Sequence, residues 1–278
     1  MNKPWERFFK TQKHPYQDRH WLWILIPELF PVPAHRSSEE ILCKTFACAQ
    51  CAKLYEIRAS CIHMPLYQSQ IDLTQQKDQL RAAQVPFASK IEPQISLLDV
   101  GCGTGSTSIP LLEKNGAVKV TAFDFSETAI NWLKKREFYD EERILGLVDD
   151  AVTCQIGQFD YAVLIFVLSA IPDVKGCLRN MKTQLKINGV LFITDYSNLD
   201  TKVIKRNGTM TDFGIQCVRE GDGTLLLGFD LELLEQYLVE IGFVVYEKFV
   251  WTRQEMNRKT GYTFVRSHFI VKVGISAK

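Results

Sequence analysis

The sequence predicts an α/β protein with a doubly wound, mostly parallel, seven-stranded sheet and an N-terminal extension. An apolar run over residues 95–100 leads into a loop with glycine at every second position, residues 101–105. A second apolar run, residues 118–124, ends in an acid roughly 20 residues past the glycines, as in nucleotide-binding βαβ units. Apolar runs and helical patterns then alternate, and successive βα units of this kind place their strands parallel.

The individual strands and helices follow from spacing and from capping residues. Strands are expected over the apolar runs 95–100, 118–124, 144–148, 159–167 and 189–195. The helices between and after them begin at residues suited to a helix start, namely Ser126, Pro172 and Asp230. We expect these helices to run to about residue 136, to the Asn-Gly pair at 188–189, and to Ile241 with Gly242 at its exit.

Two extended runs, 243–251 and 263–272, follow without a helix between them and are joined through residues 259–261 (Lys-Thr-Gly). They predict a terminal hairpin, so the last strand of the sheet is antiparallel. This ending separates the chain from an all-parallel dehydrogenase sheet. We expect a catalytic domain over residues 95–278, preceded by an extension over residues 1–94 that contains a cysteine-bearing insertion.

The insertion, residues 31–94, holds four of the eight cysteines, Cys43, Cys48, Cys51 and Cys61, together with His63. The Cys48–Cys51 pair has the C-x₂-C spacing of a zinc half-site. A second tight pair is missing, so free thiols are favoured and no metal site is predicted. Cysteines spread this widely suit a reducing compartment rather than a secreted scaffold.

Composition narrows the function classes. The chain has no apolar run long enough to span a bilayer, and its first residues lack the apolar segment of a secretory signal. We therefore expect a cytoplasmic protein, with the nucleus as a second possibility. The net charge is only +1, but the two ends, 1–21 and 253–278, are basic around an acidic centre. Basic ends are typical of a phosphate-binding rim, and ordinary solvated surface explains them equally well.

The glycine loop predicts a nucleoside-cofactor site. A dinucleotide loop reads G-x-G-x-x-G, whereas this one reads G-x-G-x-G and continues with Ser106. Asp99, two residues before the first glycine, suits the charged amino-acid end of S-adenosylmethionine. Asp124 closes the second strand, where ribose hydroxyls are held. The pattern is similar to motif I of class I methyltransferases, whose domain is Rossmann-like; the alternative is a glycine turn of purely structural use.

Further blocks of the sequence extend this similarity. They are residues 5–9 (WERFF), 18–21 (DRHW), 27–29 (PEL), 123–126 (FDFS), 164–170 (LIFVLSA), 195–196 (DY), 218–219 (VR), 222–224 (DGT), and Arg253 with residues 257–258 (NR). Together they resemble the eukaryotic tRNA N3-methylcytidine methyltransferases, the methyltransferase-like 2, 6 and 8 group with its yeast counterparts. The resemblance covers about residues 5–30 and 97–273. The chain departs from the family pattern at Phe9, Gln17, Thr194 and Ser197.

This resemblance implies methyl transfer from S-adenosylmethionine to N3 of cytidine 32 in the anticodon loop of a seryl or threonyl tRNA. It also implies an accessory protein such as seryl-tRNA synthetase. The implied cofactor residues are Trp5 and Phe9 as a lid, then Asp99, Gly101, Gly103, Gly105, Asp124, Phe125, Asp149 or Asp150, and Ile165. The implied tRNA contacts are Arg19, His20, Trp21, Arg219, Arg253, Asn257 and Arg258.

The residues are compatible with this chemistry. Enzymes that methylate exocyclic amines of bases often carry an Asn/Asp-Pro-Pro motif after the fourth strand, and here that place reads Phe166-Val167-Leu168-Ser169-Ala170. Cytosine N3 offers a neutral lone pair at neutral pH, so no strong general base is needed and alignment with the methyl group suffices. Asp195 is the candidate for stabilising the cationic product. A cap or turn acid at a strand end is the equally supported alternative.

Two other functions remain open at this stage. One is a class I methyltransferase that acts on a small molecule or a protein. The other is a methyltransferase-like subunit that binds RNA without catalysis. Binding of tRNA that depends steeply on salt would argue against the first. Binding of S-adenosylmethionine would argue against the second.

Overall fold

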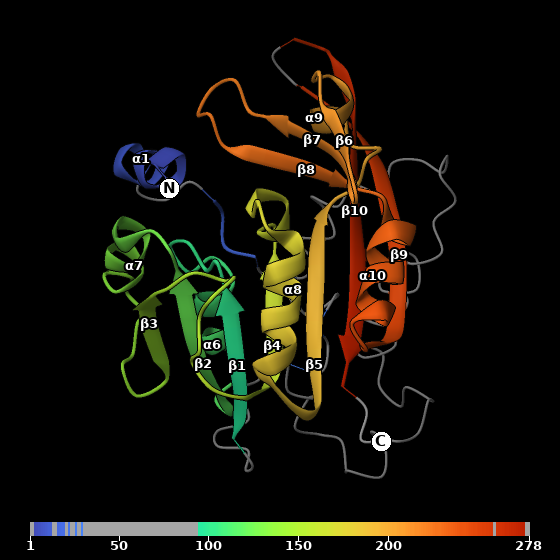
Figure 1. Cartoon of the computed structure of the whole chain (residues 1–278). Helices are drawn as coiled ribbons and strands as arrows, with labels where there is room; N and C mark the ends of the chain where they lie inside the picture. The colour runs from blue at the N-terminus through green and yellow to red at the C-terminus, as the bar shows by residue number, and fades with distance from the viewer. Residues whose placement is uncertain are drawn as a thin grey trace, which may run out of the picture.

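The computed structural model describes residues 3–12, 16–19, 22, 26, 29, 94–257 and 260–275. In this part of the chain a seven-stranded sheet runs in the order β3-β2-β1-β4-β5-β10-β9 (Figure 1). Its strands are β1 (Ile95–Val100), β2 (Val118–Asp124), β3 (Ile144–Val148), β4 (Phe159–Ile165), β5 (Leu185–Tyr196), β9 (Val244–Met256) and β10 (Thr263–Gly274). The cysteines of residues 31–93, and likewise His20, Trp21 and Arg258, lie outside the described residues.

The predicted sheet is confirmed. β1 pairs in parallel with both β2 and β4, and β4 pairs in parallel with β5. The terminal hairpin adds the antiparallel part, because β10 pairs with β5 on one side and with β9 on the other. The strand order reverses between β1 and β4, and ligands of open α/β sheets bind beyond the carboxyl ends of the strands at such a switch point.

Both faces of the sheet are covered, as strands buried on both sides require. On one face lie α8 (Val174–Thr183) and α10 (Leu231–Glu240), packed over Leu98 and other buried residues of β1, β4 and β5. On the other lie α6 (Ser108–Lys114) and α7 (Glu127–Leu133). Leu22, Ile26 and Leu29 of the extension join this second core, so the extension is part of the domain's packing.

The predicted caps hold, but several boundaries differ. Ser126 accepts a hydrogen bond from the amide of Ala129, and Asp230 accepts from the amides of Glu232 and Leu233. α7 ends at Leu133, about a turn early. α8 runs from Val174 to Thr183 and is capped by Asp173, so Pro172 does not open it. The Asn-Gly pair at 188–189 does not end a helix but lies within β5, where Asn188 takes a φ of 64°.

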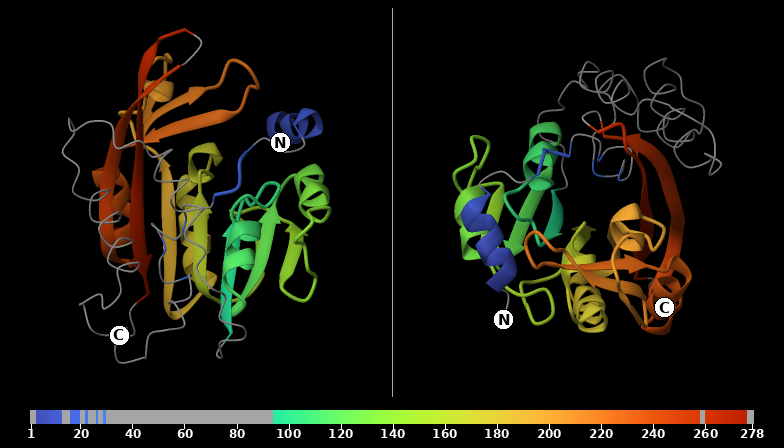
Figure 2. Two further views of the ribbon diagram at one scale, coloured as in Figure 1. Left: turned by 180° about the vertical axis from the view of Figure 1, so that it is seen from behind. Right: turned by 90° about the horizontal axis from the view of Figure 1, so that it is seen from above.

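One region was not predicted at all. Between β5 and α10 the chain forms the short helix α9 (Thr201–Ile204) and a three-stranded antiparallel sheet of β6 (Thr209–Thr211), β7 (Gly214–Val218) and β8 (Leu225–Phe229). This small sheet and the N-terminal helix α1 (Lys3–Thr11) both lie beyond the carboxyl ends of the parallel strands (Figures 1 and 2). No helix of the described residues is long and apolar enough to cross a membrane.

Candidate active site

The glycine loop after β1 needs glycine for two separate reasons. Gly101 and Gly103 have φ angles of 60° and 56°, which side-chain-bearing residues rarely adopt. A Cβ on Gly101 would lie 2.5 Å from Cγ1 of Val167, closer than carbon atoms approach. A Cβ on Gly103 would lie 3.4 Å from Cζ of Phe9 in α1. The loop is therefore pressed between the segment after β4 and the N-terminal helix.

Asp124, the last residue of β2, fixes this loop. One carboxylate oxygen accepts a hydrogen bond from the Gly103 amide at 2.9 Å, and the other accepts from the Ser126 amide at 2.9 Å. Burial raises the pKa of Asp124 to about 6, against the opposing effect of these two amides. The predicted ribose acid thus also joins the loop to the start of α7.

Asp99 and Arg19 form a second polar centre at the switch point. Asp99 is buried in β1 and accepts from the hydroxyl of Ser108; burial raises its pKa to about 6, while Arg19 acts in the opposite direction. The Arg19 amide donates to the Ser106 carbonyl at 2.9 Å, and its guanidinium donates to Thr107 Oγ1 at 2.5 Å. Arg19, predicted to contact tRNA, therefore lies against the glycine loop.

The helix α1, whose Trp5 and Phe9 are the predicted lid residues, lies against the loop. The Glu6 carboxylate accepts from Ser126 Oγ and from Thr128 Oγ1, each at 2.5 Å, and these hydrogen bonds lower its pKa. Phe9 is buried over Gly103. The ring of Trp5 lies 6.1 Å from that of Phe9, centroid to centroid. On its other side Trp5 contacts Arg219, whose guanidinium carbon is 5.7 Å from the indole centroid.

The predicted adenine contacts lie at the same edge of the sheet. Asp149, which follows β3, is half-buried and Asp150 is exposed. The Asp149 amide donates to the Asp124 carbonyl at 3.2 Å, so the ends of β2 and β3 stay together. Half-buried Phe125 follows Asp124, and buried Ile165 ends β4. Their individual contacts with the cofactor stay predictions.

These residues fit S-adenosylmethionine. Arg19 and Asp99 present opposite charges, which match the carboxylate and ammonium of its amino-acid end. Asp124 presents an acid where ribose hydroxyls are held, and the glycines leave backbone free for close approach. Thr104 Oγ1 in the same loop is buried and has no hydrogen-bond partner among the described residues. A buried hydroxyl of this kind is a candidate ligand contact, because unpaired buried polar groups are costly.

Asp195, the candidate for charge stabilisation, is fully buried in β5. Its two oxygens accept from the amides of Ser169 and Tyr196, both at 2.9 Å. Burial raises its pKa to about 6. Of the two roles left open by the sequence, this geometry favours the cap: Asp195 holds the short 3₁₀ turn Leu168–Ala170 against the end of β5.

Beside Asp195 lies a cluster of aromatic rings and cations that the sequence did not reveal as a unit. The ring of Tyr196 lies 5.3 Å from that of Phe166 and 5.2 Å from that of His268. Lys202 and Arg219 lie 5.1 and 5.9 Å from the Tyr196 centroid. Phe166 has a φ of 59°, and non-glycine residues held in this conformation cluster at functional sites. We refer to these five residues as the Tyr196 cluster.

The predicted tRNA contacts are only partly brought together. Arg219 joins α1 to the Tyr196 cluster. Asn257 is exposed at the distal end of the β9–β10 hairpin, and the backbone of Arg253 lies in β9. The sequence signal that could have revealed the Tyr196 cluster was the Asp195-Tyr196 block, which ends the fifth strand at the edge of the sheet where ligands bind.

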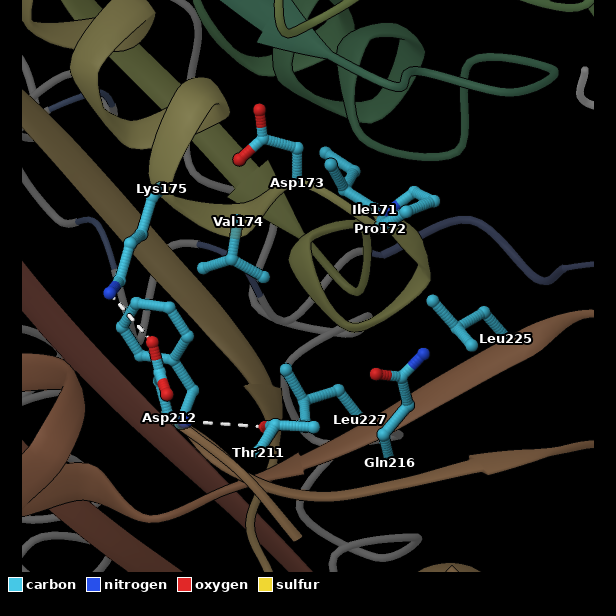
Figure 3. A pocket seen from close by; sticks show the side chains of 11 residues that line it. Ile171, Pro172, Asp173, Val174, Lys175, Thr211, Asp212, Gln216, Leu225 and Leu227 are labelled. Carbon is cyan, nitrogen blue, oxygen red and sulfur yellow. Dashed lines mark hydrogen bonds and ion pairs between the residues drawn. The ribbon is translucent and has the colours of Figure 1, made fainter. Parts of the chain in front are cut away.

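A separate cavity of about 260 Å³ lies between the start of α8 and the small sheet (Figure 3). Lys175 and Asp212 form an ion pair of 2.6 Å among its lining residues, close to Val174 and Leu227. None of the residues predicted to bind cofactor or tRNA lines this cavity.

A doubly wound sheet with an antiparallel terminal hairpin, a glycine loop at the switch point and acids at the ends of adjacent strands define a class I S-adenosylmethionine-dependent methyltransferase. Over residues 73–248, more than half of the chain, the sequence matches the family described as "Methyltransferase domain". The chain therefore belongs to this family, and the predicted fold class, cofactor and enzyme class are confirmed.

Relatives and solved structures sharpen this assignment. A Gallus gallus protein named tRNA N(3)-cytidine methyltransferase METTL2 is 28% identical over 94% of this chain and 77% of its own length. A Dictyostelium discoideum protein named O-methyltransferase 3 is 28% identical over 92% of this chain and 65% of its own length. A SAM-dependent methyltransferase from Methanosarcina mazei shares the fold, with a TM-score of 0.51 at 17% identity over 68% of this chain and 95% of its own.

Proposed function

We propose that this protein methylates N3 of a cytidine in tRNA, at position 32 of the anticodon loop. The observation that carries the proposal is the meeting of two sites at one sheet edge. The cofactor residues around the glycine loop lie beside the Tyr196 cluster, and Trp5 and Arg219 connect them. The relatives named as tRNA N(3)-cytidine methyltransferases, which match nearly the whole chain, support the choice of substrate.

The chemistry needs little from the protein beyond placement. S-adenosylmethionine supplies a methyl group on a sulfonium, and the N3 lone pair forms the new bond to carbon as the carbon–sulfur bond breaks. The sulfur keeps the bonding electrons, and the cytosine ring becomes a cation. No proton has to be removed, so a general base is not required. Aligning N3 with the methyl group and excluding water therefore account for catalysis.

The described residues can supply this placement. Arg19 and Asp99 would hold the two charges of the amino-acid end, and Asp124 would hold the ribose. The α1 helix, tied down through Glu6 and Phe9, would exclude water above the glycine loop. N3 lies on the Watson–Crick edge, so the cytidine must be unpaired, and an anticodon loop offers such a base at low cost. A seryl or threonyl tRNA in the cytoplasm fits this proposal, with seryl-tRNA synthetase as an accessory partner.

The test combines purified protein, S-adenosylmethionine and a seryl or a threonyl tRNA transcript, with and without seryl-tRNA synthetase. We expect mass spectrometry of the digested tRNA to show N3-methylcytidine. A matched transcript with uridine at position 32 should show none. Methylation of that control would move the target to another position. Formation of 5-methylcytidine, or no product with seryl or threonyl tRNA under any of these conditions, would overturn the proposed reaction.

A second function is favoured by one observation, the match to the Dictyostelium O-methyltransferase. Transfer to a hydroxyl oxygen requires loss of its proton, so such an enzyme benefits from a base near the reacting atom. The strand-end acid that the sequence offered, Asp195, is fully buried, and its two oxygens already accept from two amides. This geometry suits a ring nitrogen better than a hydroxyl. Turnover of phenolic acceptors in the absence of tRNA would favour the O-methyltransferase instead.

A further inference from the structure

Two cations from separate elements converge on Tyr196 at the end of β5. Lys202 lies in α9, and its Nζ donates to the Tyr196 hydroxyl at 3.2 Å while lying 5.1 Å from the ring centroid. Arg219 follows β7, and its guanidinium carbon lies 5.9 Å from the same centroid. A hydrogen bond of 2.9 Å from Arg219 to Thr224 Oγ1 orients its side chain. Both positive charges thus lie within 6 Å of one ring centroid, and the Arg219 charge helps to lower the pKa of Lys202.

These charges lack acidic partners in the part of the chain that the structure describes. Neither Lys202, Arg206 nor Arg219 has a carboxylate oxygen within salt-bridge distance there. The acids of this neighbourhood have other partners. Asp222, in the turn after Arg219, accepts from the amide and the hydroxyl of Thr224. Asp200 accepts from the Ser267 amide at 2.9 Å and lies 3.4 Å from Arg266, and both oxygens of Asp195 are held by amides.

The neighbourhood is unfavourable for a further positive charge. The pKa of Lys202 is lowered to about 8, first by burial and then by Arg266, Arg219 and Arg206, with Asp200 acting in the opposite direction. In addition, Arg206 Nε is buried and has no hydrogen-bond partner among the described residues. An anion bound between Lys202 and Arg219 would offset this repulsion and supply acceptors for their N–H groups.

The identity of the anion follows from the chemistry next to it. The sulfonium of the cofactor is positive, and the cytosine ring becomes positive as N3 is methylated. Cations that faced the ring would therefore oppose the reaction. Cations that bind the backbone beside the target nucleotide fix the position of that nucleotide. The bound RNA phosphate is negative and balances the local positive charge. We propose that Lys202 and Arg219 bind one RNA backbone phosphate adjacent to the target cytidine. This inference rests on the proposed function.

The experiment measures binding of a tRNA anticodon stem-loop as a function of potassium chloride concentration. The variants are Lys202→Gln, Arg219→Gln and the double variant. Lys186→Gln is the matched control, because Lys186 lies at the opposite end of β5, paired with Asp160. Each single variant should weaken binding about tenfold and reduce the salt slope by about 0.7, the value for one single-strand phosphate. Affinity for S-adenosylmethionine should not change in Lys202→Gln, and the control should match the wild type.

Sharing of one phosphate predicts a second, more specific result. The double variant should bind little worse than the weaker single variant, because removing either cation already disrupts the same contact. A stem-loop with one neutral methylphosphonate next to the target nucleotide provides the complementary test. The wild-type protein should bind the modified stem-loop about tenfold more weakly than the unmodified one. The double variant should bind the two stem-loops equally well.

The outcomes separate the two proposals. If Lys202→Gln and Arg219→Gln keep the wild-type affinity and salt slope while N3-methylcytidine is still formed, the phosphate site is wrong and the proposed function stands. The site would also be overturned if the affinity loss of the double variant equalled the product of the two single losses and a methylphosphonate on either side of the target had no effect. That result would assign the two cations to different contacts. A wild-type chain that binds no tRNA and methylates none would overturn both. Loss of S-adenosylmethionine binding in either variant would reassign that residue to the cofactor site.

Discussion

The glycine-loop side and the Tyr196 side of the active site are built in different ways. On the glycine-loop side, the acids Asp99 and Asp124 are buried and hold hydroxyl and amide donors from the same βαβ unit. On the Tyr196 side, cations and rings come from β5, α9, the loop after β7 and β10, which are distant in sequence. The comparison teaches that the predicted cofactor site depends on local geometry, whereas the proposed RNA site depends on how remote segments pack.

The largest effect is expected from Asp124→Ala, a substitution that disrupts only the glycine-loop side. Asp124→Ala leaves the amides of Gly103 and Ser126 without acceptors, which should lower the free energy of unfolding by about 1–3 kcal/mol. Calorimetry should detect no binding of S-adenosylmethionine, while stem-loop affinity stays near that of the wild type. Asp140→Ala removes an exposed turn acid and serves as the control. Cofactor affinity within about threefold of the wild type in Asp124→Ala would remove Asp124 from the cofactor site.

Arg19 decides where the boundary between the two sides lies. The sequence places it among the tRNA contacts, but its guanidinium donates to Thr107 and its amide donates to Ser106. Arg19→Ala should therefore weaken S-adenosylmethionine binding by about tenfold, or about 1.4 kcal/mol, and leave the salt slope of stem-loop binding unchanged. Calorimetry and the salt titration measure the two quantities. A slope reduced by about one, with cofactor affinity kept, would return Arg19 to the RNA side.

The smallest of these effects is a difference in pH dependence between folding stability and cofactor affinity. The pKa values of Asp99 and Asp124 are raised to about 6, so protonation favours the folded ligand-free chain. Their contribution to stability therefore grows as pH falls through 6 and is lost as pH rises through it. Each carboxylate that the cofactor needs in its ionised form should lower the affinity about tenfold between about pH 7.5 and pH 5. Calorimetry at several pH values checks this, and an affinity that stays constant or rises would show that neither acid binds the cofactor in its charged form.

Sequence predicted the glycine-loop side well because its determinants are local. The loop, the strand-end Asp124 and the cap Ser126 follow from short local patterns, and each lies where its pattern places it. The Asn-Gly pair at 188–189 misled the prediction, because the same residues that end a helix also suit an irregular strand. Strands of three to five residues, such as β6 and β8, carry too few side chains to show a period.

The contacts of Arg19 with the glycine loop could not be predicted for a different reason. An Asp-Arg-His-Trp block next to a basic terminus favours an RNA contact when only composition and resemblance are considered. Its contacts with Ser106 and Thr107 depend on how the extension packs on the second core through Leu22, Ile26 and Leu29. That packing is long-range, and no local pattern records it.

The position of β10 in the sheet has a consequence for synthesis on the ribosome. β10 lies between β5 and β9, so β9 has no strand partner in the sheet until β10 has been made. The glycine-loop half can fold as soon as β1 to β5 have emerged, because domains form from the N-terminus as translation proceeds. His268, carried by β10, completes the Tyr196 cluster last. During that interval the edge of β5 is unpaired, which makes this stage of synthesis the one most open to wrong strand pairing and to protection by a chaperone.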